Sequence, residues 1–207
     1  MKKETHSDKS TAEKIIETAI ALFARKGYAA VSVKELAEEA GVNIALISYY
    51  FGGKEKLYTL ALETQFELAD IIMNTVNSMD SSPIEKIRYF TREFARMNNN
   101  NPYTSLIYGE ILNPSPCFDA VVKPRIVRFH SFLCDHINAA IVNGEFRSDL
   151  DSHSAALALG SLIHFCFSNR EVYKELLPEG ENQIENYVCK AVEDYFRGVL
   201  NQSSHKN

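Results

Sequence analysis

The 207-residue chain contains few of the residues that break up helices or let a segment cross a membrane. It has only nine glycines and six prolines, and it has no run of eighteen apolar residues. The small glycine and proline content argues against a low-complexity or disordered chain, and the missing apolar run argues against a transmembrane helix. With 45% apolar and 24% charged residues, the composition indicates a soluble globular protein without a membrane partner.

Cysteines are also few, and they are widely spaced at Cys117, Cys134, Cys166 and Cys189. Each lies in an apolar stretch of helical pattern, which favours reduced, buried thiols over a disulfide framework. The first ten residues, MKKETHSDKS, lack the apolar centre and cleavage site of a signal peptide. We therefore expect a cytoplasmic protein.

Motifs of enzymes and metal proteins are missing as well. The chain has no Glu-x-x-His, which di-iron helical bundles need. The stretch FGGKEK lacks the upstream glycine and the following Ser or Thr of a phosphate-binding loop. His130 and Cys134 are four residues apart and could supply two metal ligands, but no second pair accompanies them at metal-site spacing. We expect no enzyme activity, no cofactor and no metal site.

The apolar residues that are present recur at helical spacing along almost the whole chain. TAEKIIETAIALFARKGY predicts one amphipathic helix that stops at Gly27. Ser32, with Glu35 as its capping-box partner, begins a second helix that ends at Gly41. Asn43 caps a third, very short helix, IALISYYF, and the Gly-Gly pair after it separates this helix from a long fourth one.

Helical patterns continue after the turn-forming segment from Asp80 to Pro83, and no segment is a convincing strand. The sequence therefore predicts an all-α fold of about nine helices. A three-helix head at residues 1–54, ordered from about residue 11, would be joined by the long fourth helix to a helical bundle at residues 55–207. The head carries a net charge of about +1 over residues 1–60, whereas the remainder carries −6. This asymmetry suits a head that faces a polyanion.

The second and third helices have the dimensions of a helix-turn-helix, whose second helix lies in the major groove of DNA. Ile47 and Phe51 are four apart and can anchor the third helix to the core of the head. The remaining side chains then point outward, where they can meet thymine methyl groups and phosphates. From periodicity alone, Tyr49 and Tyr50 could equally be core aromatics, and Lys54 could be a solvated charge.

The stretch from Thr11 to about Leu60 resembles the DNA-binding domain of the tetracycline-repressor (TetR) family, in "ALFARKGY", "VSVKELAEEAGVN" and "YYFGGKEKLY". The resemblance implies a transcriptional regulator, most often a repressor, that a small-molecule effector of unknown identity releases from double-stranded DNA. It also implies that the DNA contacts come from Ser32, Ala45, Leu46, Ser48, Tyr49, Tyr50 and Lys54.

The resemblance further implies that the C-terminal part forms a homodimer and holds the effector. The last two helical stretches suit a two-fold seam, because one offers small residues and the other an apolar stripe. A two-fold dimer predicts a palindromic operator, with the two reading helices about 34–36 Å apart. The residues expected at the seam are Ala155, Ala158, Leu159, Leu162, Ile184, Val188, Val192, Tyr195 and Phe196.

An effector pocket would be expected where polar and aromatic side chains interrupt apolar helices. The candidates are Arg92, Arg96, Tyr103, Tyr108, Glu110, Arg128, His130 and His164. The alternative function is an all-helical protein-interaction module that does not bind DNA, whose signature would be the absence of salt-dependent DNA binding.

Overall fold

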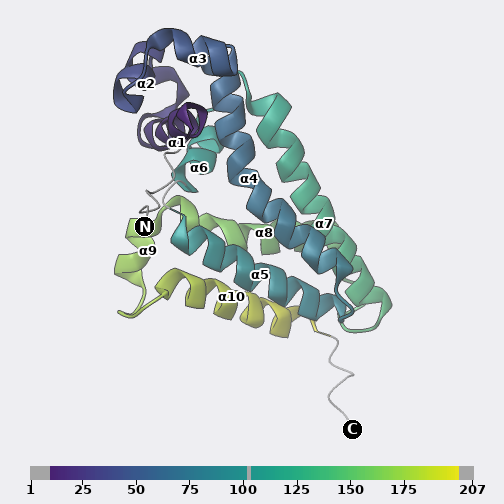
Figure 1. Cartoon of the computed structure of the whole chain (residues 1–207). Coiled ribbons are helices and arrows are strands. Elements are labelled where there is room, and N and C mark those ends of the chain that lie inside the picture. The colour runs from purple at the N-terminus through teal and green to yellow at the C-terminus, as the bar shows by residue number, and fades with distance from the viewer. Residues whose placement is uncertain (1–9, 102–103, 201–207) are drawn as a thin grey trace, which may run out of the picture. The chain divides into compact units, whose positions relative to one another are not determined.

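The computed structural model describes residues 10–101 and 104–200, and helices account for most of these residues (Figure 1). In order, the helices are α1 (Thr11–Ala30), α2 (Val33–Ala40), α3 (Ile44–Phe51), α4 (Lys54–Ser78), α5 (Pro83–Asn100), α6 (Thr104–Leu112), the short π-helix η1 (Phe118–Val122), α7 (Lys123–Val142), α8 (Ser152–Ser168), α9 (Arg170–Leu176) and α10 (Gln183–Val199).

The predicted all-α fold is confirmed, since the described residues contain no strand beyond one isolated bridge between Phe146 and Leu200. The predicted count of about nine helices omitted α9 and η1. Helix α9 has seven residues, none of them buried, so it has no periodic apolar face to detect. Among the described helices, none combines the length and the apolar character that a bilayer crossing requires.

Local capping explains where the helices begin. Ser10 and Glu13 form a complete capping box at the start of α1. At α2, Ser32 accepts a hydrogen bond from the Glu35 N–H at 3.1 Å, but the Glu35 carboxylate pairs with Lys26 instead of returning to the cap. The predicted capping box at α2 is therefore only half formed. Gly27 has φ 75° and ψ 167° and interrupts α1, as its place in the sequence predicts.

The chain folds into two compact units. Unit 1 contains α1 to α3, the part of α4 up to Gln65, α6 and η1, and unit 2 contains the rest of α4, α5 and α7 to α10. The division lies within α4, after Gln65, whereas the sequence pattern predicts a head that ends at residue 54. Residues 105–122 also join unit 1, although the segments on either side of them belong to unit 2.

The core of unit 1 contains a buried tyrosine and a buried glutamate. Tyr58, on α4, packs its ring against Phe23 at a centroid distance of 4.7 Å, and its hydroxyl donates a hydrogen bond of 2.7 Å to the Glu110 carboxylate on α6. Glu110 also accepts from the backbone N–H of Ser115 at 2.9 Å and from its hydroxyl at 2.7 Å. Burial and the Glu110 hydrogen bond together raise the pKa of Tyr58. A carboxylate with three donors has the partners that a buried polar group needs.

The core of unit 2 lies among α5, α7, α8 and α10, which pack pairwise. Phe90 and Phe94 of α5 meet Phe129 and Phe132 of α7 at centroid distances of 5.0–6.3 Å. On α10, the buried residues recur at positions 184, 188, 192 and 196, so one face of the helix is entirely apolar. Cys134 and Cys166 are buried in this unit, in agreement with the expected buried thiols.

Candidate nucleic-acid interface

Helices α2 and α3 are joined by a tight turn whose backbone is fully capped. Gly41 ends α2 in the left-handed conformation with φ 63°, which glycine adopts without steric cost. The Val42 N–H then donates to the Ala37 carbonyl at 2.9 Å, and Asn43 begins α3 by accepting a hydrogen bond of 2.9 Å from the Ala45 N–H. These bonds fix the direction of α3 relative to α2, as a helix-turn-helix requires.

Helix α3 is short and attached to unit 1 by very little buried surface. Ile47 is its one fully buried side chain, and Phe51 is half-buried, as the predicted anchors require. Tyr49 is 79% exposed and Tyr50 is 45% exposed, and the two rings contact each other edge to face at 5.0 Å. Neither tyrosine is therefore a core aromatic, and that interpretation of the pattern is wrong.

The other predicted contact residues of α3 divide by exposure. Ala45 and Ser48 are exposed, whereas Leu46 is half-buried. Ile44 is also exposed, although the sequence analysis did not include it. The positions 44, 45, 48 and 49 are spaced one and four apart and therefore share one face of the helix. This spacing was a signal available in the sequence for Ile44.

Lys54, at the start of α4, lies over an aromatic ring rather than free in solvent. Its Nζ is 4.2 Å from the centroid of Tyr28, within the range of a cation–π contact. Tyr28 in turn packs on Tyr58 at a centroid distance of 4.8 Å, and burial raises the pKa of Tyr28. The ring contacts hold the lysine stem beside the first turn of α4, where backbone N–H groups and the helix dipole favour an anion.

Other basic side chains of unit 1 are paired with carboxylates of α2. Lys26 pairs with Glu35, and this hydrogen bond lowers the pKa of Glu35. Arg25 lies 3.2 Å from Glu39, and Lys34 of α2 lies 3.7 Å from Glu38. These exposed pairs contribute little to stability and are screened by salt. Their carboxylates offset much of the positive charge that the sequence places near α2.

Residues 15–60, which contain α1 to α3, match the bacterial regulatory proteins of the tetR family. Residues 83–201 match the C-terminal domain of the HTH-type transcriptional dual regulator CecR, a stretch that is more than half of the chain. The chain belongs to the TetR family. Membership in this family of bacterial regulatory proteins confirms the resemblance of its N-terminal residues to the family.

Individual proteins of known sequence or structure are similar to this TetR-family chain. The probable HTH-type transcriptional regulator YttP of Bacillus subtilis is 34% identical over 122 residues, which are 58% of this chain and 59% of YttP. IcaR of Staphylococcus aureus, the negative regulator of a biofilm operon, is 30% identical over 48% of this chain and 60% of IcaR. This chain thus spans about three fifths of each of these relatives.

Solved structures match over more of the chain. KstR2 of Mycobacterium tuberculosis, a ketosteroid transcriptional regulator, superposes with a TM-score of 0.76 at 18% identity and covers 95% of this chain and 98% of its own. A mutant of HlyIIR superposes with a TM-score of 0.68 at 26% identity and covers 93% of this chain and 97% of its own. The fold of the TetR family therefore extends over both units.

The described residues predicted for an effector pocket belong to both units, and those of unit 2 lie at several places within it. Glu110 and Tyr108 belong to α6 of unit 1, where Glu110 is occupied by Tyr58 and Ser115. In unit 2, Arg128 bonds Asp70 at 2.9 Å and Asn74 at 3.2 Å. Tyr103 lies outside the described residues.

The remaining predicted pocket residues lie in unit 2. Arg96 is exposed and pairs with Glu93 and Glu185. The ring of His164 lies between Phe94 and Phe129, at centroid distances of 4.5 and 4.7 Å, and burial lowers its pKa to about 4. Arg92 lies at a surface hollow, and His130 lies in a cluster with Cys134 and His153.

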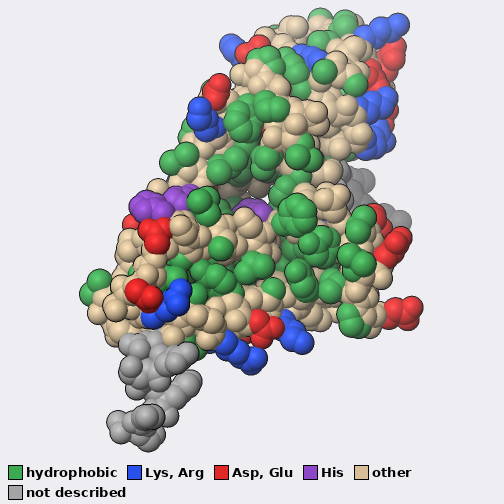
Figure 2. Space-filling view, turned by 180° about the vertical axis from the view of Figure 1, so that it is seen from behind, with side chains coloured by type: hydrophobic (Ala, Val, Ile, Leu, Met, Phe, Trp, Pro, Cys, Tyr) green, Lys and Arg blue, Asp and Glu red, His purple; other side chains and the backbone are tan. Residues whose placement is uncertain are grey.

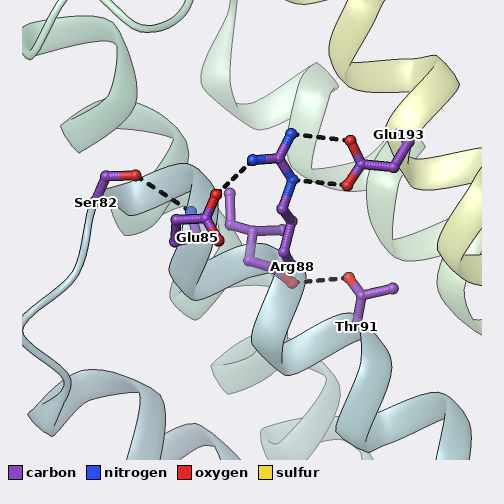
Figure 3. Close-up of polar contacts among 6 residues, drawn as sticks. Ser82, Glu85, Arg88, Thr91 and Glu193 are labelled. Carbon is purple, nitrogen blue, oxygen red and sulfur yellow. Dashed lines mark hydrogen bonds and ion pairs between the residues drawn. The ribbon is translucent and has the colours of Figure 1, made fainter.

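Arg92 lines a hollow of about 390 Å³ on the surface of unit 2, between α5 and α10. Arg88 of α5 donates two hydrogen bonds to the Glu193 carboxylate of α10, at 2.6 and 2.9 Å, and one to Glu85 at 2.6 Å (Figure 3). We call Arg88, Glu193 and Glu85 the charged fork. The bond to Glu193 raises the pKa of Arg88. Six of the nine residues that line the hollow carry a charge, and the nine are Arg88, Thr91, Arg92, Cys189, Lys190, Val192, Glu193, Asp194 and Arg197.

Most residues predicted for the dimer seam lie inside a single subunit. Six of them are buried in the core of unit 2, namely Ala155, Leu159, Ile184, Val188, Val192 and Phe196. Leu162 and Tyr195 are half-buried, and Tyr195 donates a hydrogen bond of 3.1 Å to the Ala155 carbonyl. Ala158 is exposed. The apolar periodicity of these helices marked the face turned toward the subunit's own core.

Helix α8 nevertheless leaves a second apolar face in solvent. Leu157 is 63% exposed and Phe165 is 61% exposed, with the exposed small residues Ala158 and Ser161 between them. We call these four residues the α8 stripe. Hydrophobic side chains are abundant over unit 2 on the face seen in Figure 2. Large exposed apolar residues at helical spacing are typical of an interaction surface.

Proposed function

We propose that this regulator binds a palindromic operator as a homodimer, with α3 of each subunit in the major groove, and that it represses transcription until a small molecule releases it. The observation that carries the proposal is the pair of exposed tyrosines on a short helix that is capped at both ends. A folded protein rarely leaves such rings in solvent without a partner.

The outer face of α3 suits the edges of base pairs and the sugar-phosphate backbone. Tyr49 and Ala45 offer apolar surface to thymine methyl groups, and the Ser48 hydroxyl offers a hydrogen bond to a base or a phosphate. Lys54 and the first backbone N–H groups of α4 form a phosphate site beside α3. Ser32 at the start of α2 would provide another.

The α8 stripe supports the homodimer. Helix α8 carries no Asp, Glu, Lys or Arg, so two copies of it can pack without burying a charge. Its small residues between Leu157 and Phe165 allow close approach of a second helix. An isologous contact of this kind gives the two-fold symmetry that a palindrome requires.

Release by a small molecule rests on family membership and on α4, which runs from unit 1 into unit 2 without a break. A ligand that favours one arrangement of the dimer changes operator affinity by its differential binding energy, about 1–3 kcal/mol. Repression is supported by the relative IcaR, a negative regulator, whereas CecR is a dual regulator. We place this activity in the cytoplasm.

The test is selection of bound fragments from random and genomic DNA by the purified protein at two salt concentrations. We expect one palindrome, with affinity that falls as salt rises because phosphate contacts release counterions. Tyr49→Ala should weaken operator binding about 10- to 100-fold, since a good base-edge contact contributes about 1–3 kcal/mol. Its stability should be unchanged, because Tyr49 is mostly exposed.

Leu60→Ala is the matched control, since Leu60 is an exposed apolar residue of the same unit and belongs to α4 instead of α3. It should bind the operator like the parent. Enrichment of no palindrome, or equal binding by the Tyr49→Ala and Leu60→Ala proteins, would remove the assignment of α3 as the reading helix. An α-helical interaction module would then be the better description of the head.

A further inference from the structure

Three potential metal ligands from two helices of unit 2 meet at one place. His130 and Cys134 lie four residues apart on α7, and His153 is the second residue of α8. One ligand atom from each residue lies within 4.8 Å of the other two. Histidine side chains are gathered at the surface of this unit in Figure 2. The sequence pattern shows only the α7 pair, because His153 comes close to it through the packing of α8 on α7.

Two of the three distances within this cluster match those between ligands of one tetrahedral ion, and the third is at most 4.8 Å. The Cys134 Sγ lies 3.6 Å from the His130 Nε2 and 3.6 Å from the His153 Nδ1. A zinc ion with bonds of about 2.3 Å to sulfur and 2.0–2.1 Å to nitrogen separates these ligand atoms by about 3.5 Å at the tetrahedral angle. Both contacts therefore need little change to hold an ion.

We propose that His130, Cys134 and His153 bind a thiophilic divalent metal ion, with Zn²⁺ as the expected occupant. Zn²⁺ binds thiolate and imidazole ligands well, whereas the hard cations Mg²⁺ and Ca²⁺ prefer oxygen ligands. Three protein ligands leave a fourth position for water or a small anion. Binding transfers the Cys134 thiol proton to solvent, and each imidazole coordinates through an unprotonated nitrogen.

The surroundings of the cluster favour a cation. Burial, with the nearby carboxylates of Asp135 and Asp151, raises the pKa of Cys134. The same two carboxylates stabilise a positive ion at this place. Without an ion, the thiol has a weak contact of 3.7 Å with the Ser152 carbonyl.

Both helices belong to unit 2, so a bound ion would join the middle of α7 to the first turn of α8. His153 is exposed and His130 is half-buried, which leaves a path from solvent to the buried sulfur. Residues 143–151, which connect the two helices, would then form a loop whose flanking helices are linked by the ion. The site does not depend on DNA binding or on an effector.

The experiment uses the tag-free, full-length chain, reduced and freed of metal by a chelator. Zn²⁺ is titrated in competition with a chromophoric chelator, and Co²⁺ is added separately to report ligand chemistry by absorption. We expect one Zn²⁺ per chain, release of about one proton near neutral pH, and a thiolate-to-cobalt charge-transfer band.

Three variants locate the ion. Changing a residue that merely orients a metal ligand weakens binding about 10- to 100-fold, so losing a ligand in His153→Ala should cost at least about 100-fold. Cys134→Ser should abolish the charge-transfer band. Cys189→Ser, which changes a half-buried cysteine outside the cluster, should match the parent in both measurements.

His153 is exposed, so its replacement leaves the fold intact even if Cys134→Ser fails to fold. The proposal is overturned if the parent takes up no Zn²⁺ at micromolar free concentration. It is equally overturned if His153→Ala binds Zn²⁺ within tenfold of the parent, or if Co²⁺ gives no charge-transfer band with the parent.

Discussion

Helices α3 and α8 both present large apolar side chains to solvent, but they differ in how firmly they are attached. Helix α3 has eight residues and buries one of them, Ile47, whereas α8 has seventeen residues and buries six. The side chains they expose also differ, since α3 shows two tyrosines with hydroxyl groups and α8 shows Leu157 and Phe165. The two exposed surfaces therefore suit different partners.

The difference follows from the chemistry of each partner. A tyrosine combines an apolar ring with a polar tip, so it can lie against a base edge and still bond water or phosphate. Leucine and phenylalanine on a helix without charged residues can only gain by meeting another apolar surface. We therefore expect changes on α8 to alter assembly and changes on α3 to alter DNA binding alone.

The largest effect should come from a charge in the α8 stripe. Phe165→Glu places a carboxylate where the proposed seam would desolvate it, so the protein should become monomeric in sedimentation experiments. Operator affinity should fall about 10²- to 10⁴-fold, because the second half-site loses its high effective concentration. Val142→Glu, at an exposed apolar position at the end of α7, should remain dimeric. A dimeric Phe165→Glu protein would show that the seam lies elsewhere.

A smaller effect should appear when the solution is acidified, because α8 holds a half-buried histidine, His164, and α3 has no histidine. The folded-state pKa of His164 is about 4, below the ordinary value of 6.5. The unfolded chain thus binds the proton first, so stability is full above about pH 6.5 and declines as the pH falls toward 4. The decline from this group should be about 2–3 kcal/mol.

This contribution can be isolated by urea unfolding at pH 7 and pH 4.5. His164→Phe keeps a ring between Phe94 and Phe129, and it should lose less stability on acidification than the parent. His136, whose pKa burial also lowers, remains in both proteins and cancels from the difference. If the two proteins lose the same free energy of unfolding between pH 7 and pH 4.5, His164 is not a source of the acid sensitivity.

Removing a helix cap should cost about 1 kcal/mol and test how weakly α3 is attached. Asn43→Ala deletes the cap of α3, and Ser82→Ala deletes the equivalent hydrogen bond at α5. Both should lower the free energy of unfolding by similar amounts, whereas only Asn43→Ala should weaken operator binding. Loss of operator affinity in Ser82→Ala as well would indicate that general stability, not the position of α3, controls DNA binding.

The smallest effect should come from the charged fork between α5 and α10. Arg88 and Glu193 are each more than a third exposed, so solvent screens their interaction. A double-mutant cycle with Arg88→Met and Glu193→Gln should give a coupling of about 1 kcal/mol or less, which decreases as salt is added. A coupling free energy well above 1 kcal/mol that does not change with salt would contradict this expectation and show that the charged fork stabilises unit 2 strongly.

The sequence predicted the turn and the helix ends around α3 well because their determinants are local. Gly41, Asn43 and Gly52 act on residues within four positions of themselves, so their spacing specifies where α2 ends and where α3 begins and ends. The exposed state of Tyr49 depends on packing against more distant helices, and periodicity over eight residues could not decide it.

The unit 2 residues were harder to place because their roles depend on contacts between distant helices. Val188 and Phe196 follow an apolar pattern that a core face and a seam share, so the pattern could not separate burial within one chain from burial between two. Likewise, nothing in the local sequence around His153 indicates that Cys134, nineteen positions earlier, lies beside it.

The hydrogen bond between Tyr58 and Glu110 joins the two segments of unit 1, residues 1–65 and 105–122, which are far apart in the sequence. A fragment that ends after the tetR-type segment at residue 60 would keep Tyr58 but lose helix α6, which carries the glutamate that accepts the hydrogen bond of Tyr58. The head is thus not a portable module. A hybrid regulator with an exchanged head should inherit its new specificity only if residues 105–122 are transplanted from the same donor.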